Sequence, residues 1–374
     1  MKPSFIVLII TILTSLIAPR FIELAFADPQ FDAVRAKTEQ GDADAQNTLC
    51  RMYYKGEGVV RDYNESLVWC RKAAEQGKPE AQYRLGLIYD NGRGIAKDFT
   101  EAARWYRKSS EQGYNDAQYN LGMMYYTGQG VAQNYKEAIK WFWKLAEQND
   151  AEAQRNLGMM YYTGQGVAQD YNEALKWIRK ASEQGDAGGQ NNLGVMYTNG
   201  QGIAQDYAEA VKWYQKSADQ KYANAQYNLG LMFANGRGVV HDDVEAVKWY
   251  LKAADQGLVN AQYNLGTAYY TGKGVAQNYK EAMKWFQKAA DQGFANAQYN
   301  LGVLYKNGQG VAKNHTEAMK WYQKAADQGD ADAKNALSRE KQRRENVINI
   351  WLNTAVGLSF GLLLRRLILG RFFY

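Results

Sequence analysis

The chain repeats itself every 36 residues, and this period constrains its fold more than any other feature of the sequence. The stretch LGMMYYTGQGVAQ occurs at residues 121–133 and again, unchanged, at 157–169. Eight units run without an insertion over residues 41–328. Each unit has a tryptophan at the same position: Trp69, Trp105, Trp141, Trp177, Trp213, Trp249, Trp285 and Trp321. A fixed period of this length indicates a solenoid, in which each unit buries its apolar face against its neighbours.

One unit has the pattern of two helices joined by a short turn. In residues 77–112 the apolar residues Ala81 and Leu85 recur at the spacing of one helical face, and a second apolar helix follows a glycine-containing turn. Glycine or asparagine is expected to head every unit, as Asn149 does, because both tolerate the left-handed region. Gly86 lies in mid-helix, where glycine costs about 1 kcal/mol relative to alanine. Its recurrence in seven units predicts close approach of the second helix.

These motifs closely resemble the Sel-one-like repeat (SLR) family, a relative of the tetratricopeptide repeats. The resemblance is seen in A-Q-Y-N-L-G at residues 225–230 and E-A-V-K-W-Y at residues 245–250, and it covers about 288 of the 374 residues. It implies an all-α fold, a right-handed superhelical α/α solenoid of eight helix pairs that holds other proteins. Outside the repeats, residues 28–40 are expected to form a lead-in helix and residues 329–346 a capping helix with a basic linker.

The positive charge of the chain is concentrated in its C-terminal tail. The formal net charge is +6, and residues 334–374 alone contribute +6. Residues 28–333, which include all the repeats, are near −1. Because binding to phosphates needs a concentrated basic face, no nucleic-acid partner is predicted.

The N-terminus has the pattern of a secretory signal. Lys2 precedes an apolar run over residues 5–17, and Ala25-Phe26-Ala27 fits a cleavage site with small residues. Residues 1–27 are therefore interpreted as a signal peptide. The alternative is an uncleaved membrane anchor, although a 13-residue apolar core is short for a bilayer span.

The two cysteines, Cys50 and Cys70, lie on the two predicted helices of the first unit. Cys50 stands where the other units have glycine, and Cys70 stands where they have Tyr, Phe or Ile. Two departures of the same chemical type in one unit favour a disulfide, which is the expected state in an exported protein. The alternative is two buried free thiols.

A second apolar segment lies near the C-terminus. Residues 347–364 form a mostly apolar stretch of 18 residues, which is near the minimum for a transmembrane helix, and three arginines follow it within the tail 347–374. A membrane span is favoured, with the arginines on the cytoplasmic side. The alternatives are a helix lying on the membrane surface and a helix docked on the last repeat.

Residues that could carry out catalysis are scarce. The two histidines, His241 and His315, lie in different units without cysteines beside them, so they make no zinc site. Ser338 and Lys341 match a Ser-x-x-Lys motif, but the partner motifs Ser-Asp-Asn and Lys-Thr-Gly do not occur. The Gly-x-Gly turns follow helices and are interpreted as helix–helix connectors. No catalytic residue, metal ligand, cofactor or small-molecule substrate is predicted.

Binding of a protein or an extended peptide is the favoured function class, and the first helix of each unit carries the candidate residues. In the resemblance to tetratricopeptide arrays, first helices line the concave face. In six units the residue before the Leu-Gly pair is an asparagine: Asn120, Asn156, Asn192, Asn228, Asn264 and Asn300, whereas the first two units have Thr48 and Arg84. The residue before that is a tyrosine in five units, Tyr83, Tyr119, Tyr227, Tyr263 and Tyr299, and is Asn47, Arg155 or Asn191 in the others. Carboxamides at a repeated position match the amide groups of an extended peptide, and aromatic residues suit protein recognition. The alternatives are amides that bind their own connector and rings that pack between repeats.

The sequence therefore predicts a non-enzymatic adaptor of the cell envelope. We expect it to be exported through the secretory pathway, to lie in the periplasm and to be anchored to the inner membrane by residues 347–364. One alternative is a secreted β-lactamase or peptidoglycan-acting SLR enzyme. Another is an SLR adaptor of the endoplasmic-reticulum lumen, which also combines a signal peptide, SLRs and a C-terminal span.

Overall fold

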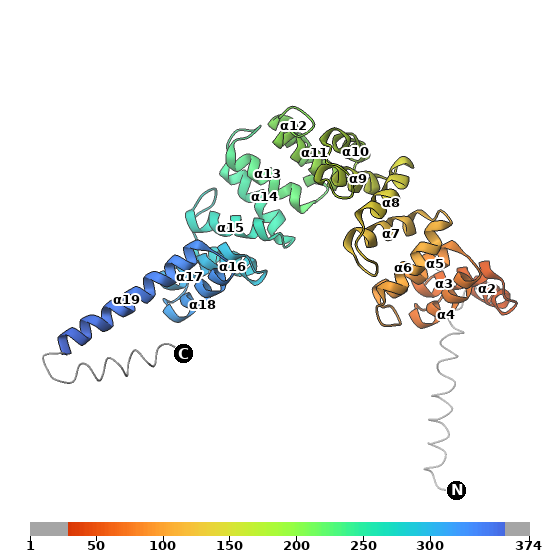
Figure 1. Ribbon diagram of the computed structural model, residues 1–374, viewed down its shortest axis with the longest axis horizontal. Coiled ribbons are helices and arrows are strands. Elements are labelled where there is room, and N and C mark those ends of the chain that lie inside the picture. Colours follow the sequence, from red (N-terminus) through yellow and green to blue (C-terminus); the bar gives the residue numbers. More distant parts are fainter. Residues whose placement is uncertain (1–28, 356–374) are drawn as a thin grey trace, which may run out of the picture. The chain divides into compact units, whose positions relative to one another are not determined.

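A computed structural model describes residues 29–355, and its secondary structure over this range is entirely helical (Figure 1). The expected all-α solenoid of eight helix pairs is confirmed. The first helix of each pair, here called the A helix, is α3 (Ala43–Lys55), α5 (Pro79–Asn91), α7 (Asn115–Thr127), α9 (Ala151–Thr163), α11 (Ala187–Asn199), α13 (Ala223–Asn235), α15 (Val259–Thr271) or α17 (Ala295–Asn307). The second, here called the B helix, is α4 (Tyr63–Glu75), α6 (Phe99–Glu111), α8 (Tyr135–Glu147), α10 (Tyr171–Glu183), α12 (Tyr207–Asp219), α14 (Asp243–Asp255), α16 (Tyr279–Asp291) or α18 (His315–Asp327).

The described part of the chain forms two compact units. Unit 1 contains residues up to 189 together with 201–203, and unit 2 contains residues 190–200 and those from 204 onward. Repeats 1 to 4 lie in unit 1, and repeats 6 to 8 lie in unit 2.

The helix ends follow from local sequence. Each B helix begins after an aspartate or asparagine whose side chain accepts a backbone N–H, as Asp98 does from Glu101. A helices end at a glycine in the left-handed region, such as Gly92 with φ 68°. These caps satisfy backbone groups that the helices leave unpaired, so each unit of the repeat encodes its own start and stop.

The link from each B helix to the next A helix also uses the left-handed region. Asn149 has φ 69° there, as expected from the sequence. The expectation that glycine or asparagine heads every unit is wrong at one position, because Lys221 occupies it with φ 63°. A side chain with Cβ costs about 1–2 kcal/mol in this conformation. The neighbouring repeats, which have glycine at this position, avoid that cost.

We expect Lys221→Gly to raise the free energy of unfolding by about 1 kcal/mol, because it removes the Cβ from a left-handed residue. The measurement is urea unfolding of unit 2, followed by circular dichroism. Gly257→Lys, at the equivalent position one repeat later, is the matched variant and should lower stability by a similar amount. Equal stability of Lys221→Gly and the parent chain would contradict the account.

In repeats 2 to 8, the A and B helices meet at the mid-helix glycine. A Cβ placed on Gly86 would lie 2.5 Å from the ring of Tyr106, and one on Gly230 would lie 2.7 Å from Tyr250. Tyr106 is fully buried as a result. The predicted close approach of the second helix is confirmed, and it explains why a residue unfavourable in helices recurs at this position.

The connecting turn also packs against the preceding repeat. Its second glycine, as in Gly128-Gln129-Gly130, lies against the start of the preceding B helix. A Cβ on Gly130 would overlap the carbonyl group of Phe99, and Gly130 also has φ 72°. The interpretation of the Gly-x-Gly turns as helix–helix connectors is therefore correct. The turns also pack each repeat against the preceding one.

A single helix covers each end of the array. At the N-terminal end α2 (Pro29–Glu39) buries Phe31 against Tyr53 of α3, with ring centroids 5.8 Å apart. At the other end α19 (Ala331–Ala355) packs Ala333 and Leu337 against α18. Terminal helices of this kind cover apolar surface that would otherwise face water.

The C-terminal helix is longer than the sequence indicates. The expected capping helix at 329–346 continues without interruption to Ala355, so it includes the first residues of the predicted tail 347–374. Between Pro29 and Ala355, no helix combines the length and the apolarity needed to cross a bilayer. The predicted signal peptide, 1–27, lies outside the described residues, as do residues 356–364 of the predicted span.

Candidate partner-binding surface

The predicted asparagines lie on the A helices, half-buried, and most of them bond to a neighbouring repeat or helix. Asn156 Nδ2 donates to Tyr119 Oη of the preceding repeat at 3.1 Å. Asn228 Nδ2 donates to Asn191 Oδ1 at 2.9 Å. Asn120 bonds to Tyr83 and Tyr106, and Asn264 bonds to Tyr227 and Tyr250. These bonds join each asparagine to side chains of the preceding repeat, so part of the hydrogen-bonding capacity of the row is used within the array.

The predicted tyrosines pack between repeats and against their own B helix. Tyr83 lies 5.1 Å from Tyr114, and Tyr263 lies 5.1 Å from Phe294, between ring centroids. Burial, together with the Asp116 carboxylate, raises the pKa of Tyr83 to about 12. The rings therefore present only part of their surface to solvent. The remaining tyrosines of the row are packed in the same way against B-helix rings: Tyr119 on Phe142, Tyr227 on Tyr250, and Tyr299 on Tyr322.

Arg155 replaces the tyrosine in repeat 4, and the residues around it accommodate its charge and its length. Its guanidinium donates to Asp186 Oδ2 at 2.9 Å and to Glu152 Oε1 at 2.9 Å. Burial alone would lower the pKa of Arg155, but Asp186 and Glu152 raise it above its ordinary value. A Cβ on Gly188 would lie 2.8 Å from Arg155 Cδ, so the glycine leaves room for the longer side chain.

A row of buried glutamines, which the sequence reasoning missed, joins the repeats. Gln226 of α13 donates to the Ala218 carbonyl at the end of the preceding B helix, at 3.3 Å. Gln256, at the end of the B helix of the same repeat, donates to Gln226 Oε1 at 2.7 Å. The same pair of bonds occurs with Gln82 and Gln112 in repeat 2.

The sequence contains a pattern that could have predicted these hydrogen bonds. The Q of A-Q-Y-N-L-G and the Q that precedes each left-handed residue recur in every unit. Only the first of these two glutamines is buried, and a buried amide must find hydrogen-bond partners within the protein. In the third repeat, Gln118 keeps its bond to the preceding B helix, but its Oε1 has no hydrogen-bond partner among residues 29–355.

We expect Gln226→Ala to lower the free energy of unfolding by about 2 kcal/mol, because it removes the two hydrogen bonds that this buried amide makes to neighbouring helices, with the Ala218 carbonyl and with Gln256. Asn228→Ala, two residues away on the same helix and only half-buried, should cost about 1 kcal/mol or less. Denaturant unfolding of the two variants measures both values. A larger loss for Asn228→Ala than for Gln226→Ala would show that the asparagine row, and not the glutamine row, joins the repeats.

The outward face of the B helices pairs its own charges and rings. A lysine three residues after each repeat tryptophan lies 3.6–5.9 Å from the centroid of its ring, as Lys252 does at Trp249. In repeats 2 to 8, a glutamate also pairs with a lysine or arginine three residues later, as Glu245 pairs with Lys248 at 2.7 Å. The B-helix face is therefore uniform from repeat to repeat.

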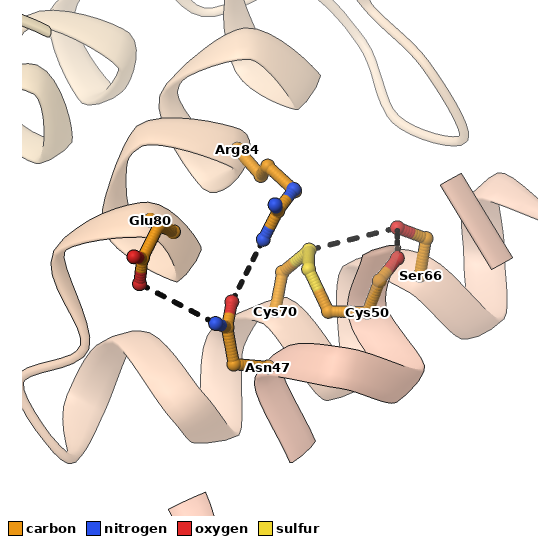
Figure 2. Close-up of a disulfide and its surroundings, with 6 residues drawn as sticks. All are labelled: Asn47, Cys50, Ser66, Cys70, Glu80 and Arg84. Atoms are coloured by element: carbon orange, nitrogen blue, oxygen red, sulfur yellow. Dashed lines mark hydrogen bonds between the residues drawn. A yellow bond between two sulfur atoms is a disulfide. The ribbon is translucent and has the colours of Figure 1, made fainter. Parts of the chain in front are cut away.

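The predicted disulfide is present. Cys50 of α3 and Cys70 of α4 are bonded, with their Cα atoms 4.8 Å apart and both side chains fully buried (Figure 2). They occupy the positions of Gly86 and Tyr106 in the next repeat, so the bond replaces the glycine–ring contact. Ser66 Oγ donates to the Cys50 carbonyl at 3.0 Å.

Beside the disulfide, a polar chain joins the first two repeats. Arg84 Nη1 donates to Asn47 Oδ1 at 2.8 Å, and Asn47 Nδ2 donates to Glu80 Oε2 at 3.4 Å (Figure 2). Asn47 takes the place of the tyrosine found in other repeats.

The unfolded, unreduced chain should contain no free thiol, and reduction should lower the stability of the first repeat by about 3 kcal/mol, the chain-entropy value for a loop of this size. A thiol assay in denaturant and hydrogen exchange in α3 and α4 measure the two effects. In the double variant Cys50→Ser and Cys70→Ser, reductant should change nothing. Two free thiols in the unreduced parent chain would be the contrary result.

The residues considered for catalysis are dispersed. His241 lies 3.3 Å from Asp243 on the surface, and His315 lies 3.7 Å from Glu340 near α19. The Lys306 ammonium, hydrogen-bonded to Glu340, holds the pKa of that carboxyl below its usual value. Among residues 29–355, no three His, Cys, Asp or Glu side chains are grouped so that they could hold a metal ion. The Ser-x-x-Lys motif lies on α19, with Ser338 exposed.

Paired helices of constant length, repeated with glycine contacts inside and glutamine bonds between, define an α/α helical-repeat protein. The chain belongs to the Sel1 repeat family, whose sequence pattern matches residues 43–78, 79–114, 115–150, 151–186, 187–222, 223–258, 259–294 and 295–330. Proteins of this family generally act as protein-interaction scaffolds.

Two solved structures are similar over most of the chain. One is a protective antigen of uropathogenic Escherichia coli strains with an SLR fold, 39% identical, covering 84% of this chain and 67% of that chain, with a TM-score of 0.67. The other is a Sel1 repeat protein from Oxalobacter formigenes, 33% identical, covering 86% of this chain and 93% of that chain, with a TM-score of 0.64. A comparison with curated protein sequences gives no match.

Proposed function

We propose that this protein is a non-enzymatic scaffold that binds a partner protein or an extended peptide on the exposed faces of its A helices. The observation that carries the proposal is the contrast between its two kinds of helix. The outward face of the B helices is the same in nearly every repeat and pairs its own charges. The A helices carry partly exposed side chains that differ between repeats, such as Arg51, Leu87 and Thr267. Recognition of one partner needs a surface of varied side chains, which the A helices supply.

We also propose that the scaffold works outside the cytoplasm, in the cell envelope. The disulfide between Cys50 and Cys70 supports this location, because such bonds persist in oxidising compartments. Attachment to the inner membrane through residues 347–364 belongs to the same proposal. Its support within the described residues is the exposure of three apolar side chains on α19: Val347 at 55%, Ile350 at 62% and Trp351 at 71%.

A photo-reactive residue at Thr127 or Thr163, both exposed at the ends of A helices, should give discrete cross-linked species in intact cells. The same residue at Lys136 or Asn172, exposed on neighbouring B helices, is the matched control and should give none. Mass spectrometry of the adducts identifies the partner and its compartment. Cross-links from the B-helix positions alone, or partners that are all cytoplasmic, would overturn the proposal.

A further inference from the structure

The A helices of unit 2 carry almost no charge. Helices α13 and α15 contain no Asp, Glu, Lys or Arg, and α17 contains only Lys306. The Lys306 ammonium is already paired, 2.7 Å from the Glu340 carboxylate of α19. In unit 1 the equivalent helices differ, because each has an acidic residue in its first turn: Asp44, Glu80, Asp116 or Glu152.

Carboxamides take the place of those charges. Three positions on one side of α13, α15 and α17, of which the first and last are exposed and the middle one is half-buried, together form what we call the amide face. Its members are Asn224, Asn260 and Asn296 in the first turn, Asn228, Asn264 and Asn300 in the middle, and Asn235, Thr271 and Asn307 at the end. Exposed helix positions are usually filled by charged residues, so the near absence of charge from three successive helices points to a specific role for this face.

The first-turn row is available to bind. Asn224, Asn260 and Asn296 are exposed, and their amides make no hydrogen bond to any residue between 29 and 355. The end row is partly used, since Asn235 Nδ2 donates to the Leu231 carbonyl of its own helix. Each first-turn amide therefore offers two N–H donors and one carbonyl acceptor to a partner, at the same position on consecutive A helices.

Such a surface disfavours partner segments that have charged side chains. A charged side chain laid on these helices would lose its water without gaining an opposite charge, which is unfavourable. A partner segment without charged side chains has no such cost. The contrast with unit 1, whose A helices carry both signs of charge, means that the two units present chemically different faces.

The matching ligand is an extended polypeptide. A carboxamide is the side-chain equivalent of a peptide group, and an extended segment exposes its backbone N–H and C=O groups. In a bound helix those groups are already used internally. A neutral polysaccharide is disfavoured, because the rings beside the face are half-buried in stacks, as Tyr263 is on Phe286, and leave little flat surface for a sugar.

We propose that the amide face binds an extended polypeptide segment that lacks charged side chains. This inference rests on the proposed scaffold function and specifies the partner of one of its two units. Since α13, α15 and α17 are helices of consecutive repeats, a segment of about 12 residues, about 40 Å when extended, can cross all three.

The test uses a display library of random peptides of about that length, selected on the full chain. A variant with Asn224→Lys, Asn260→Lys and Asn296→Lys places three charges on the amide face. Its control, Ala208→Lys, Val244→Lys and Thr316→Lys, adds the same charge at exposed B-helix positions of unit 2, where Lys136 and Lys280 occur in other repeats. Both variants should unfold at the temperature of the parent chain.

We expect a group of peptides whose affinity falls at least about tenfold, or 1.4 kcal/mol, in the amide-face variant and stays within about twofold in the control. These peptides should be depleted in Asp, Glu, Lys and Arg relative to the library. Their affinity should change little between about 50 and 500 mM NaCl, because no ion pairs are involved.

Three outcomes would overturn the inference: peptides sensitive to the variant that are rich in charge, no peptide sensitive to it, or competition by a neutral dextran. Peptides that bind but respond to neither variant would leave the scaffold function standing and place recognition elsewhere. Failure of the scaffold function itself is read separately, from the absence of cross-links at Thr127 and Thr163.

Discussion

The structure depends first on the contact between a bulky B-helix side chain and a mid-helix glycine of the A helix. A helix loses about 1 kcal/mol for each such glycine, and the array contains seven. The loss is offset because the missing Cβ lets a ring such as Tyr106 or Phe286 become fully buried. In the first repeat, which has only a single helix before it, the covalent bond between Cys50 and Cys70 takes over the same position.

The second constraint acts between repeats. Gln226 is buried and bonds both to the preceding B helix and to the end of its own B helix, so its two bonds fix the spacing of three helices. Most of its equivalents do the same, and Gln118 keeps only the first of these bonds. The second glycine of each connecting turn packs against the start of the preceding B helix and adds a further contact between the same two repeats. With packing fixed by these few positions, the outward residues of the A helices are free to vary.

The outward residues of the A helices differ in charge between the two units. Unit 1 places acidic and basic residues on its A helices and links some of them between repeats, as Arg155 links to Asp186. Unit 2 replaces them with carboxamides. The B helices, by contrast, keep the same lysine–tryptophan and glutamate–lysine pairs throughout. This contrast between constant B helices and variable A helices is the basis of the proposal that the A helices recognise the partner.

The sequence by itself determined the period, the helix pairs and the close approach at Gly86, and it favoured the pairing of Cys50 with Cys70 that the structure shows. Each of these follows from comparing equivalent positions within one chain, which periodicity makes possible. Only the tertiary structure decided what the half-buried asparagines and tyrosines contact, that glutamines and not asparagines form the buried junction, and that Lys221 is left-handed. Helical spacing shows which residues share a face. Which atom of the next repeat lies within hydrogen-bond reach depends on how two repeats stack, and this is set by packing across a boundary that no single repeat contains.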